Sequence, residues 1–149
     1  MFGSVASRRI SFAPSLIERG YGRVVNVSSD YGSFGLGLKG PASYSVTKAA
    51  LNALTRKLAE DCKHVEDVKV NAVHPGYIWS DKMEAYFRHL ANEQGRKYEE
   101  VRAEVESKTA LHHIPDSTEI ADAVLFFASD LSRGCTGQAL DVNGGHYFH

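Results

Sequence analysis

The chain has 149 residues, of which 43% are apolar, enough for one globular domain with a buried core. Seventeen basic and eighteen acidic residues give a formal charge of -1, so no basic excess indicates binding to nucleic acid or to an acidic membrane. Two cysteines are too few for a disulfide framework, and no apolar run is long enough to span a bilayer.

The N-terminal segment Phe2–Glu18 has loosely helical apolar spacing and leads without a break into the first predicted strand. Pro14 opposes a helix, because inside one it removes a hydrogen bond and clashes with the preceding turn. Arg8, Arg9, several serines and the lack of an acid before Glu18 also resemble a transit peptide. We favour a helix of the fold and a cytoplasmic location, with import into an organelle as the alternative.

A short, β-branched run bounded by glycine, Arg23–Val27, predicts a buried parallel strand. Ser28 and Ser29 follow at its carboxyl end. Ligands of open α/β sheets bind beyond the carboxyl ends of the strands, so these two hydroxyls are candidate site residues.

The next stretch, Tyr31–Gly40, is rich in glycine and contains a formal match to the dinucleotide fingerprint G-x-G-x-x-G at Gly35–Gly40. The true fingerprint opens its helix at a tight turn and has an acid about 20 residues later, at the end of the next strand. Here Glu60 falls within a predicted helix. We therefore favour a flexible active-site loop over a phosphate-binding turn.

Tyr44 and Lys48 lie at the head of a helical run, Tyr44–Cys62, and their spacing places them on one face of the helix, about 5–6 Å apart at Cβ. The positive charge of Lys48 favours the phenolate form of Tyr44. A phenol in that setting can give up or take a proton near neutral pH, which general acid–base chemistry requires.

A second strand, Val68–Val73, is followed by His74 and by Pro75-Gly76, which breaks it. A strand, a loop with serines, a helix and a further strand form one βαβ unit. The residues after each strand, among them Ser29 and Gly76, are therefore expected at one edge of the sheet.

Three further features complete the chain: a long charged helical stretch that Gly95 divides, a buried helix that begins near capping hydroxyls, and a short third strand. They are Lys82–Thr109, the segment from Ser117 and Thr118 to Ala128, and Ala139–Val142. None of the seven histidines has the spacing to a second histidine and an acid that suits zinc, so we expect no metal site.

Several of these motifs together resemble the second half of a short-chain dehydrogenase/reductase. The resemblance rests on Ser29, on Tyr44-x-x-x-Lys48, on the run Asn71 to Gly76, and on Asp141 to Gly145, and it extends from about Phe2 to the C-terminus. It implies an α/β fold with the last three strands and helices of a Rossmann-like, doubly wound parallel sheet.

The resemblance also implies site residues and chemistry. Tyr44 would act as the general acid or base, Ser29 would hold the substrate oxygen, and Lys48 would bind the nicotinamide ribose of NAD or NADP. The backbone from Pro75 and Gly76 to Ile78 and the hydroxyl of Ser80, which takes the place of a threonine common in the family, would hold the carboxamide. The reaction would interconvert a carbonyl and a secondary alcohol, and residues 82–115 would form a variable lid over the substrate.

The sequence also departs from the family. The nucleotide-binding half would precede residue 1, and the asparagine expected on the first helix is missing, since no asparagine occurs before Asn26. Residues 1–149 are therefore expected to be a single C-terminal portion of such a domain: a truncated reading, one segment of a split enzyme, or a degenerate paralogue.

Two functions follow as alternatives. The first is an oxidoreductase catalytic half that acts on a small carbonyl or alcohol. The second is a truncated, inactive module for oligomerisation or partner binding. Family members commonly pair through the helix that bears Tyr44 and the helix before it, so a homo-oligomer is expected, without nucleic acid or membrane as partners.

Overall fold

The computed structural model describes residues 13–34 and 42–148. Within them, three strands form a parallel sheet in the order β1-β2-β3: β1 (Tyr21–Val27), β2 (Asp67–Pro75) and β3 (Ala139–Val142). β1 and β2 pair from Tyr21 opposite Asp67 to Val27 opposite Val73, and β2 and β3 pair from Ala72 opposite Ala139 to Pro75 opposite Val142. Because parallel strands need crossover connections, helices cover both faces of this sheet.

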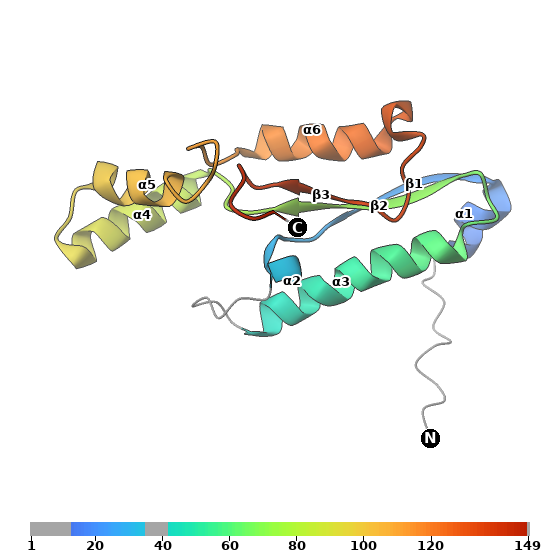
Figure 1. Ribbon diagram of the computed structural model, residues 1–149, viewed down its shortest axis with the longest axis horizontal. Coiled ribbons are helices and arrows are strands. Elements are labelled where there is room, and N and C mark those ends of the chain that lie inside the picture. The colour runs from blue at the N-terminus through green and yellow to red at the C-terminus, as the bar shows by residue number, and fades with distance from the viewer. Residues whose placement is uncertain (1–12, 35–41, 149) are drawn as a thin grey trace, which may run out of the picture.

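One face of the sheet carries α1 (Ala13–Arg19), α2 (Tyr31–Phe34) and α3 (Ala42–Asp61), and the other carries α6 (Ser117–Ala128), which is followed by the short helix η1 (Asp130–Ser132) (Figure 1). The expected helix before β1 is present from Ala13 onward, while the earlier part of Phe2–Glu18 lies outside the described residues. Pro14 does not break this helix, because it lies in the first turn, where its missing N–H has no intrahelical partner to lose.

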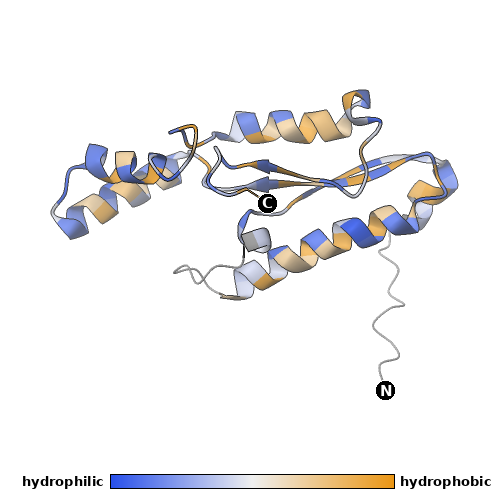
Figure 2. Cartoon of the chain, viewed as in Figure 1, coloured by the Kyte–Doolittle hydropathy of each residue, from blue (hydrophilic) through white to orange (hydrophobic). Residues whose placement is uncertain are grey.

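The buried core lies on both faces of β2. Leu58 and Ala59 of α3 pack with Val70, whereas Ala123 and Phe127 of α6 pack with Val73. Val70 and Val73 of β2 therefore point to opposite faces of the sheet, each toward a different helix layer. The two side chains are at most 1% exposed. The colouring by hydropathy in Figure 2 shows apolar and hydrophilic residues alternating along α3, as expected for a helix with one solvated face.

The predicted charged helical stretch forms two helices, α4 (Asp81–Gln94) and α5 (Tyr98–Glu106). Gly95 ends α4 with a left-handed φ of 62°, which glycine adopts without strain. Phe87, Ala91 and Val101 build a small core between the two helices. We call α4 and α5 the arm, because they extend beyond one end of the sheet (Figure 1).

The N-terminus of α6 corrects one expectation. The capping side chain is Asp116, not the hydroxyl of Ser117 or Thr118: its carboxylate accepts from the backbone N–H groups of Thr118 and Glu119 at 2.7 and 3.1 Å. Glu119 in turn accepts from the backbone N–H of Asp116, which completes a capping box.

Among the described helices, none combines the length and the apolar character needed to cross a bilayer. The same described ranges hold no group of three or more His, Cys, Asp or Glu side chains that could bind a metal ion. Cys62 is buried and Cys135 is half-buried, and both are free thiols.

Candidate active site

The segment that follows β1 stays attached to β2 beyond the end of the strand. The backbone N–H of Ser28 donates to the carbonyl oxygen of Val73 at 2.9 Å, and that of Asp30 donates to the carbonyl oxygen of Pro75 at 3.1 Å. Ser28, Ser29 and Asp30 are consequently buried, with Asp30 fully enclosed. Three polar side chains in succession are thus held out of water at the carboxyl end of the sheet, where each needs a partner.

The two serines find different partners. The hydroxyl of Ser28 donates to the carbonyl oxygen of Lys48 at 3.1 Å, which ties the strand end to α3. The hydroxyl of Ser29 accepts from the backbone N–H of Tyr31 at 3.2 Å and points its proton at Oδ1 of Asp30, 3.4 Å away. That last contact is long for an O–H···O bond, so the Ser29 proton is weakly held.

Lys48 reaches from α3 to the end of β1. Its Nζ donates to the carbonyl oxygen of Val27 at 3.0 Å and lies 5.6 Å from the centre of the Tyr44 ring. The Tyr44 ring is 44% exposed and meets the edge of the Tyr31 ring, with 6.3 Å between the ring centres. Tyr44 and Lys48 therefore share one face of α3, next to the segment that carries Ser29.

Close packing of α2 on α3 requires a glycine at position 32. A Cβ on Gly32 would lie 2.7 Å from the backbone carbon of Lys48 and 2.9 Å from the backbone nitrogen of Ala49. No heavier residue fits without moving one helix, so Gly32 fixes how near α2, and with it Tyr31, comes to the Tyr44–Lys48 face.

The turn after β2 lies against the same segment. A Cβ on Gly76 would fall 2.8 Å from Cβ of Asn143 and 2.9 Å from Oδ2 of Asp30, so the C-terminal tail and the Asp30 carboxyl close in on this turn. Ile78 is half-buried in the irregular segment that follows. Ser80 is exposed and caps α4 by accepting from the backbone N–H of Met83 at 3.3 Å, a contact that the sequence analysis did not foresee.

A buried acid–imidazole pair links Asp30 to the C-terminal tail. Nδ1 of His146 lies 3.1 Å from Oδ2 of Asp30, and their side chains are 12% and 0% exposed. Burial raises the pKa of Asp30, and the hydrogen bond and charge of His146 oppose that rise. Sequence analysis missed this pair, because the two residues are 116 positions apart and no local pattern connects them.

The phenols of Tyr77 and Tyr31 lie near the Asp30–His146 pair. The ring centre of Tyr77 lies 5.3 Å from that of His146, and burial together with a hydrogen bond to Tyr77 raises the pKa of Tyr31 to about 12. Tyr31 therefore keeps its proton at neutral pH. It stands between the buried pair and the exposed ring of Tyr44.

A second buried histidine, His74 on β2, lies beside Ser33 and Asp141. The Ser33 hydroxyl and Oδ1 of Asp141 are both 3.3 Å from the same ring atom, Nδ1. In a nucleophilic triad the serine and the acid contact opposite ring nitrogens, so this trio is not one. His74 instead joins β3 to α2.

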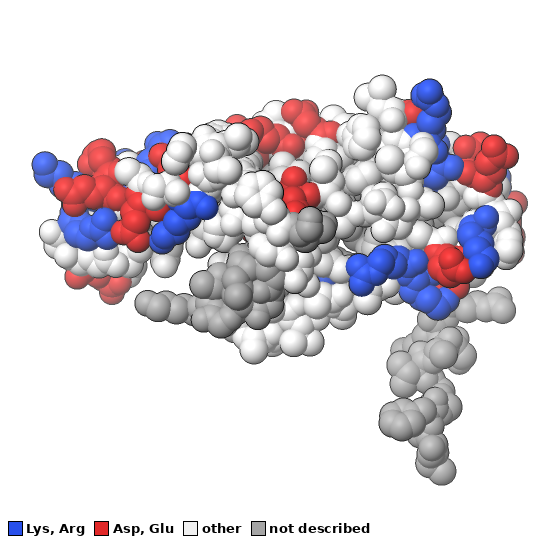
Figure 3. Space-filling model, viewed as in Figure 1, with Lys and Arg blue, Asp and Glu red and all other residues white. Residues whose placement is uncertain are grey.

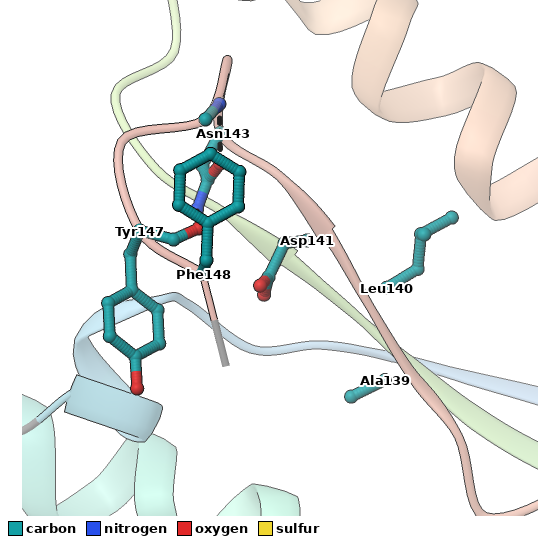
Figure 4. Close-up of a pocket in the computed structure, with 7 residues that line it drawn as sticks. Ala139, Leu140, Asp141, Asn143, Tyr147 and Phe148 are labelled. Atoms are coloured by element: carbon teal, nitrogen blue, oxygen red, sulfur yellow. Dashed lines mark hydrogen bonds between the residues drawn. The ribbon is translucent and has the colours of Figure 1, made fainter. Parts of the chain in front are cut away.

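An open groove of about 330 Å³ runs along β3 and the tail. Figure 4 shows its lining side chains, which come from the strand itself (Ala139, Leu140, Asp141) and from the chain that follows it (Asn143, Gly145, Tyr147, Phe148). Ser29, Tyr44 and Lys48 are not among them. On the face shown in Figure 3, charges of both signs gather over the arm and at the opposite end, with mostly uncharged surface between.

Comparison with known proteins gives matches over most of the chain. A family model described as enoyl-(acyl carrier protein) reductase matches residues 4–147. The chain is 36% identical over 132 residues to the 3-oxoacyl-[acyl-carrier-protein] reductase FabG of Aquifex aeolicus, with 89% of this chain and 48% of that protein covered. It is 33% identical over 131 residues to the acetoacetyl-CoA reductase of Rhizobium meliloti, with 88% of this chain and 49% of that protein covered.

Among solved structures, the actinorhodin polyketide ketoreductase with NADPH superposes with a TM-score of 0.75 at 26% identity, with 89% of this chain and 49% of that one covered. The chain thus spans about half the length of the curated relatives that it matches. The family model covers nearly all of the sequence, and the solved relative has the same α/β fold. The chain belongs to the short-chain dehydrogenase/reductase family.

Proposed function

We propose that this chain carries the catalytic residues of an NAD(P)-dependent oxidoreductase that interconverts a carbonyl and a secondary alcohol. The observation that supports this most is the shared face of α3, on which the Lys48 ammonium lies 5.6 Å from the centre of an exposed tyrosine ring. A reactive phenol has to be both accessible and close to a positive charge, and Tyr44 meets both conditions.

Tyr44 would give its phenolic proton to the carbonyl oxygen during reduction and take it back during oxidation. Ser29 would donate its hydroxyl proton to the same oxygen and so stabilise the negative charge that develops there. The long contact between the Ser29 hydroxyl and Asp30 supports this role, because a weakly held proton can turn toward a substrate at little cost.

The described residues fit the nicotinamide part of the cofactor. Lys48 offers an ammonium that already holds one carbonyl oxygen and can donate two further hydrogen bonds, as ribose hydroxyls require. The irregular backbone from Gly76 to Ile78 and the hydroxyl of Ser80 offer the donors and acceptors that a carboxamide needs. When bound, the nicotinamide supplies or accepts the hydride, and the protein contributes position and electrostatic field.

The substrate class follows from the relatives and from the arm. Two relatives are named as reductases of 3-oxoacyl and acetoacetyl thioesters. We propose a carbonyl substrate of this general kind, covered by residues 82–115 as a lid. Three partly buried aromatic residues pack on the arm's core and make this region partly apolar: Tyr98 within that segment, and Tyr77 and Trp79 just before it.

A second candidate function is supported by the outer side of α3. Val46 is 66% exposed and Leu54 is 37% exposed on this helix, so both side chains are accessible to a partner. A homo-oligomer that pairs through α3 would cover both residues. A non-catalytic module would use the same surface, so oligomerisation alone does not separate the two functions.

Titration of NADPH and NADH into the purified full chain separates them. The first function predicts saturable micromolar binding, about −8 kcal/mol, and turnover of acetoacetyl-CoA once binding is saturated. The absence of binding, together with unchanged oligomer assembly in Tyr44→Phe, would favour the non-catalytic module.

A further inference from the structure

The carboxylate of Asp30 has two side-chain partners, and the backbone N–H of Tyr31 also bonds it. Its Oδ2 lies 3.1 Å from Nδ1 of His146, and its Oδ1 lies 3.4 Å from the hydroxyl of Ser29. The Asp30 side chain is fully buried, so both contacts are shielded from water. Whatever holds one oxygen of this planar group therefore determines where the other oxygen lies.

His146 is itself held in place by the tail. Its backbone N–H donates to the carbonyl oxygen of Asn143 at 3.1 Å, and the Asn143 side chain bonds Gly145 and Tyr147 at 2.9 and 3.1 Å. The carbonyl oxygen of Gly145 accepts from the backbone N–H of Ala110 at 3.2 Å. The imidazole of His146 thus projects from a turn with several hydrogen bonds, and this turn can hold the Asp30 carboxylate in place.

We propose that His146, acting through Asp30, is a positioning residue that sets the orientation of the Ser29 hydroxyl. This inference rests on the proposed function, in which Ser29 holds the carbonyl oxygen. The inference goes beyond the proposed function because it assigns a role to the C-terminal tail, whose His146 bonds Asp30.

The physical reason lies in the hydrogen-bond directions. When Nδ1 of His146 carries the proton, Asp30 accepts from both side chains, and a lone pair of Ser29 remains available to the backbone N–H of Tyr31. Without His146, the buried Asp30 carboxyl keeps only its bonds to Ser29 and Tyr31, and burial then favours its protonated form. It then donates to the Ser29 oxygen and reverses that bond, and as a neutral acid it is a weaker acceptor for the Tyr31 N–H, which bonds both Asp30 and Ser29.

The Tyr31 amide is therefore a reporter for the Ser29 hydroxyl. Its neighbour Gly32 is an internal control, because the Gly32 N–H bonds the backbone carbonyl of Ser29 at 3.0 Å and not its side chain. Amide hydrogen exchange, followed residue by residue by NMR in the full chain, measures both. General loosening of the segment would raise exchange at both amides, whereas a turned hydroxyl affects Tyr31 alone.

We expect His146→Phe, which keeps a ring but removes the donor, to speed exchange at Tyr31 by about three- to tenfold, the factor that one ordinary hydrogen bond contributes. Gly32 should change by less than about twofold. Ser29→Ala should give the same increase at Tyr31, and the double variant should add nothing further. His146→Asn, whose amide N–H can take the place of Nδ1–H, should restore the parent pattern.

A matched control comes from a second imidazole–carboxylate pair at the surface. His113 lies 2.7 Å from Glu119, and His113→Phe should leave the Tyr31 amide unchanged. Steady-state kinetics give a second measurement. His146→Phe should lower kcat with little change in KM, and adding His146→Phe to the Ser29→Ala variant should lower kcat no further.

The outcomes separate the two proposals. Equally faster amide exchange at Tyr31 and Gly32 in His146→Phe, or unchanged exchange at Tyr31, would overturn the positioning role. This holds even if the parent chain turned over substrate. Selective acceleration at Tyr31 in a chain that turns over no carbonyl would support the positioning of the hydroxyl and contradict the proposed function.

Discussion

Lys48 connects the end of β1 to the aromatic ring of Tyr44: its Nζ donates to the carbonyl oxygen of Val27 at 3.0 Å and lies 5.6 Å from the Tyr44 ring centre. The hydrogen bond to Val27 holds the ammonium beside the Tyr44 ring. The same bond links α3 to the end of β1. Both properties can be tested by substitution.

Replacing Tyr44 by phenylalanine removes the phenolic proton while keeping the ring that meets Tyr31. We expect turnover to fall by about 100-fold or more, because general acid–base catalysis commonly contributes that much, with NADPH binding nearly intact. Steady-state kinetics and NADPH titration measure the two effects. Tyr21→Phe is the matched control, since that residue is 51% exposed at the start of β1, and near-normal turnover in Tyr44→Phe would contradict the acid–base role.

Lys48→Ala should impair both NADPH binding and turnover, because the ammonium is proposed to bind the ribose and also faces the phenol. The lost hydrogen bond to Val27 should lower the free energy of unfolding by about 1 kcal/mol. NADPH titration and urea unfolding check the two parts. Lys57→Ala serves as the control, since Lys57 lies on the solvated side of α3 and pairs with Asp61; equal effects of the two changes would argue against a special role for Lys48.

Gly76→Ala should destabilise the chain by about 1–3 kcal/mol, because the added Cβ would fall 2.8 Å from Asn143 and 2.9 Å from Asp30. Separation of the tail from the Asp30 segment should also weaken the contact of His146 with Asp30. Urea unfolding measures the loss of stability. Gly134→Ala is the control, because nothing lies within 4 Å of its Cβ position, and an equal loss there would mean that the close packing at Gly76 is not the cause.

Tyr31 should make stability depend on pH at the alkaline end. Burial and the hydrogen bond to Tyr77 raise its pKa from 10.0 to about 12, so the folded chain keeps a proton that the unfolded chain releases. The resulting stabilisation is fully present below pH 10 and is lost as the pH rises towards 12. The difference in unfolding free energy between the parent and Tyr31→Phe should therefore shrink above pH 10, as urea unfolding at pH 8, 9.5 and 10.5 can show. Tyr86→Phe, at an exposed ring, should show no such change, and a constant difference for Tyr31→Phe would contradict the raised pKa.

Much of the architecture could be predicted because it depends on local pattern. The third strand was expected at Ala139–Val142 and is found there, and Gly95 divides the charged helical stretch as expected. The first two strands are longer than predicted, since β1 begins at Tyr21 and β2 extends to Pro75. Hydrophobic periodicity marks the buried centre of a strand, but pairing with a neighbour decides where the strand ends.

The sequence pattern predicted less well the roles of single residues where more than one nearby residue could fill the same role, or where one residue could fill two. At the start of α6, hydroxyls at Ser117 and Thr118 looked like caps, yet the carboxylate of Asp116 takes that role because its backbone is the last extended residue. Ser80 was assigned only a cofactor role, and the structure shows that it caps α4. The loop predicted at Tyr31–Gly40 is wrong at its start, where Tyr31–Phe34 form the helix α2. The match to a dinucleotide fingerprint at Gly35–Gly40 lies outside the described residues, so for that part the loop interpretation stays a prediction.

The sequence by itself determined the α/β class, the chain order of the three strands and the longer helices, and the Tyr44–Lys48 pair, because these depend mainly on patterns between residues close together in the chain. The tertiary structure alone decided which side chains surround Ser29. A parallel sheet brings the carboxyl ends of distant strands to one edge, and there Asp30 meets an imidazole 116 positions away. No local spacing encodes that contact, since it depends on how the tail turns after β3 and on the absence of a side chain at Gly76.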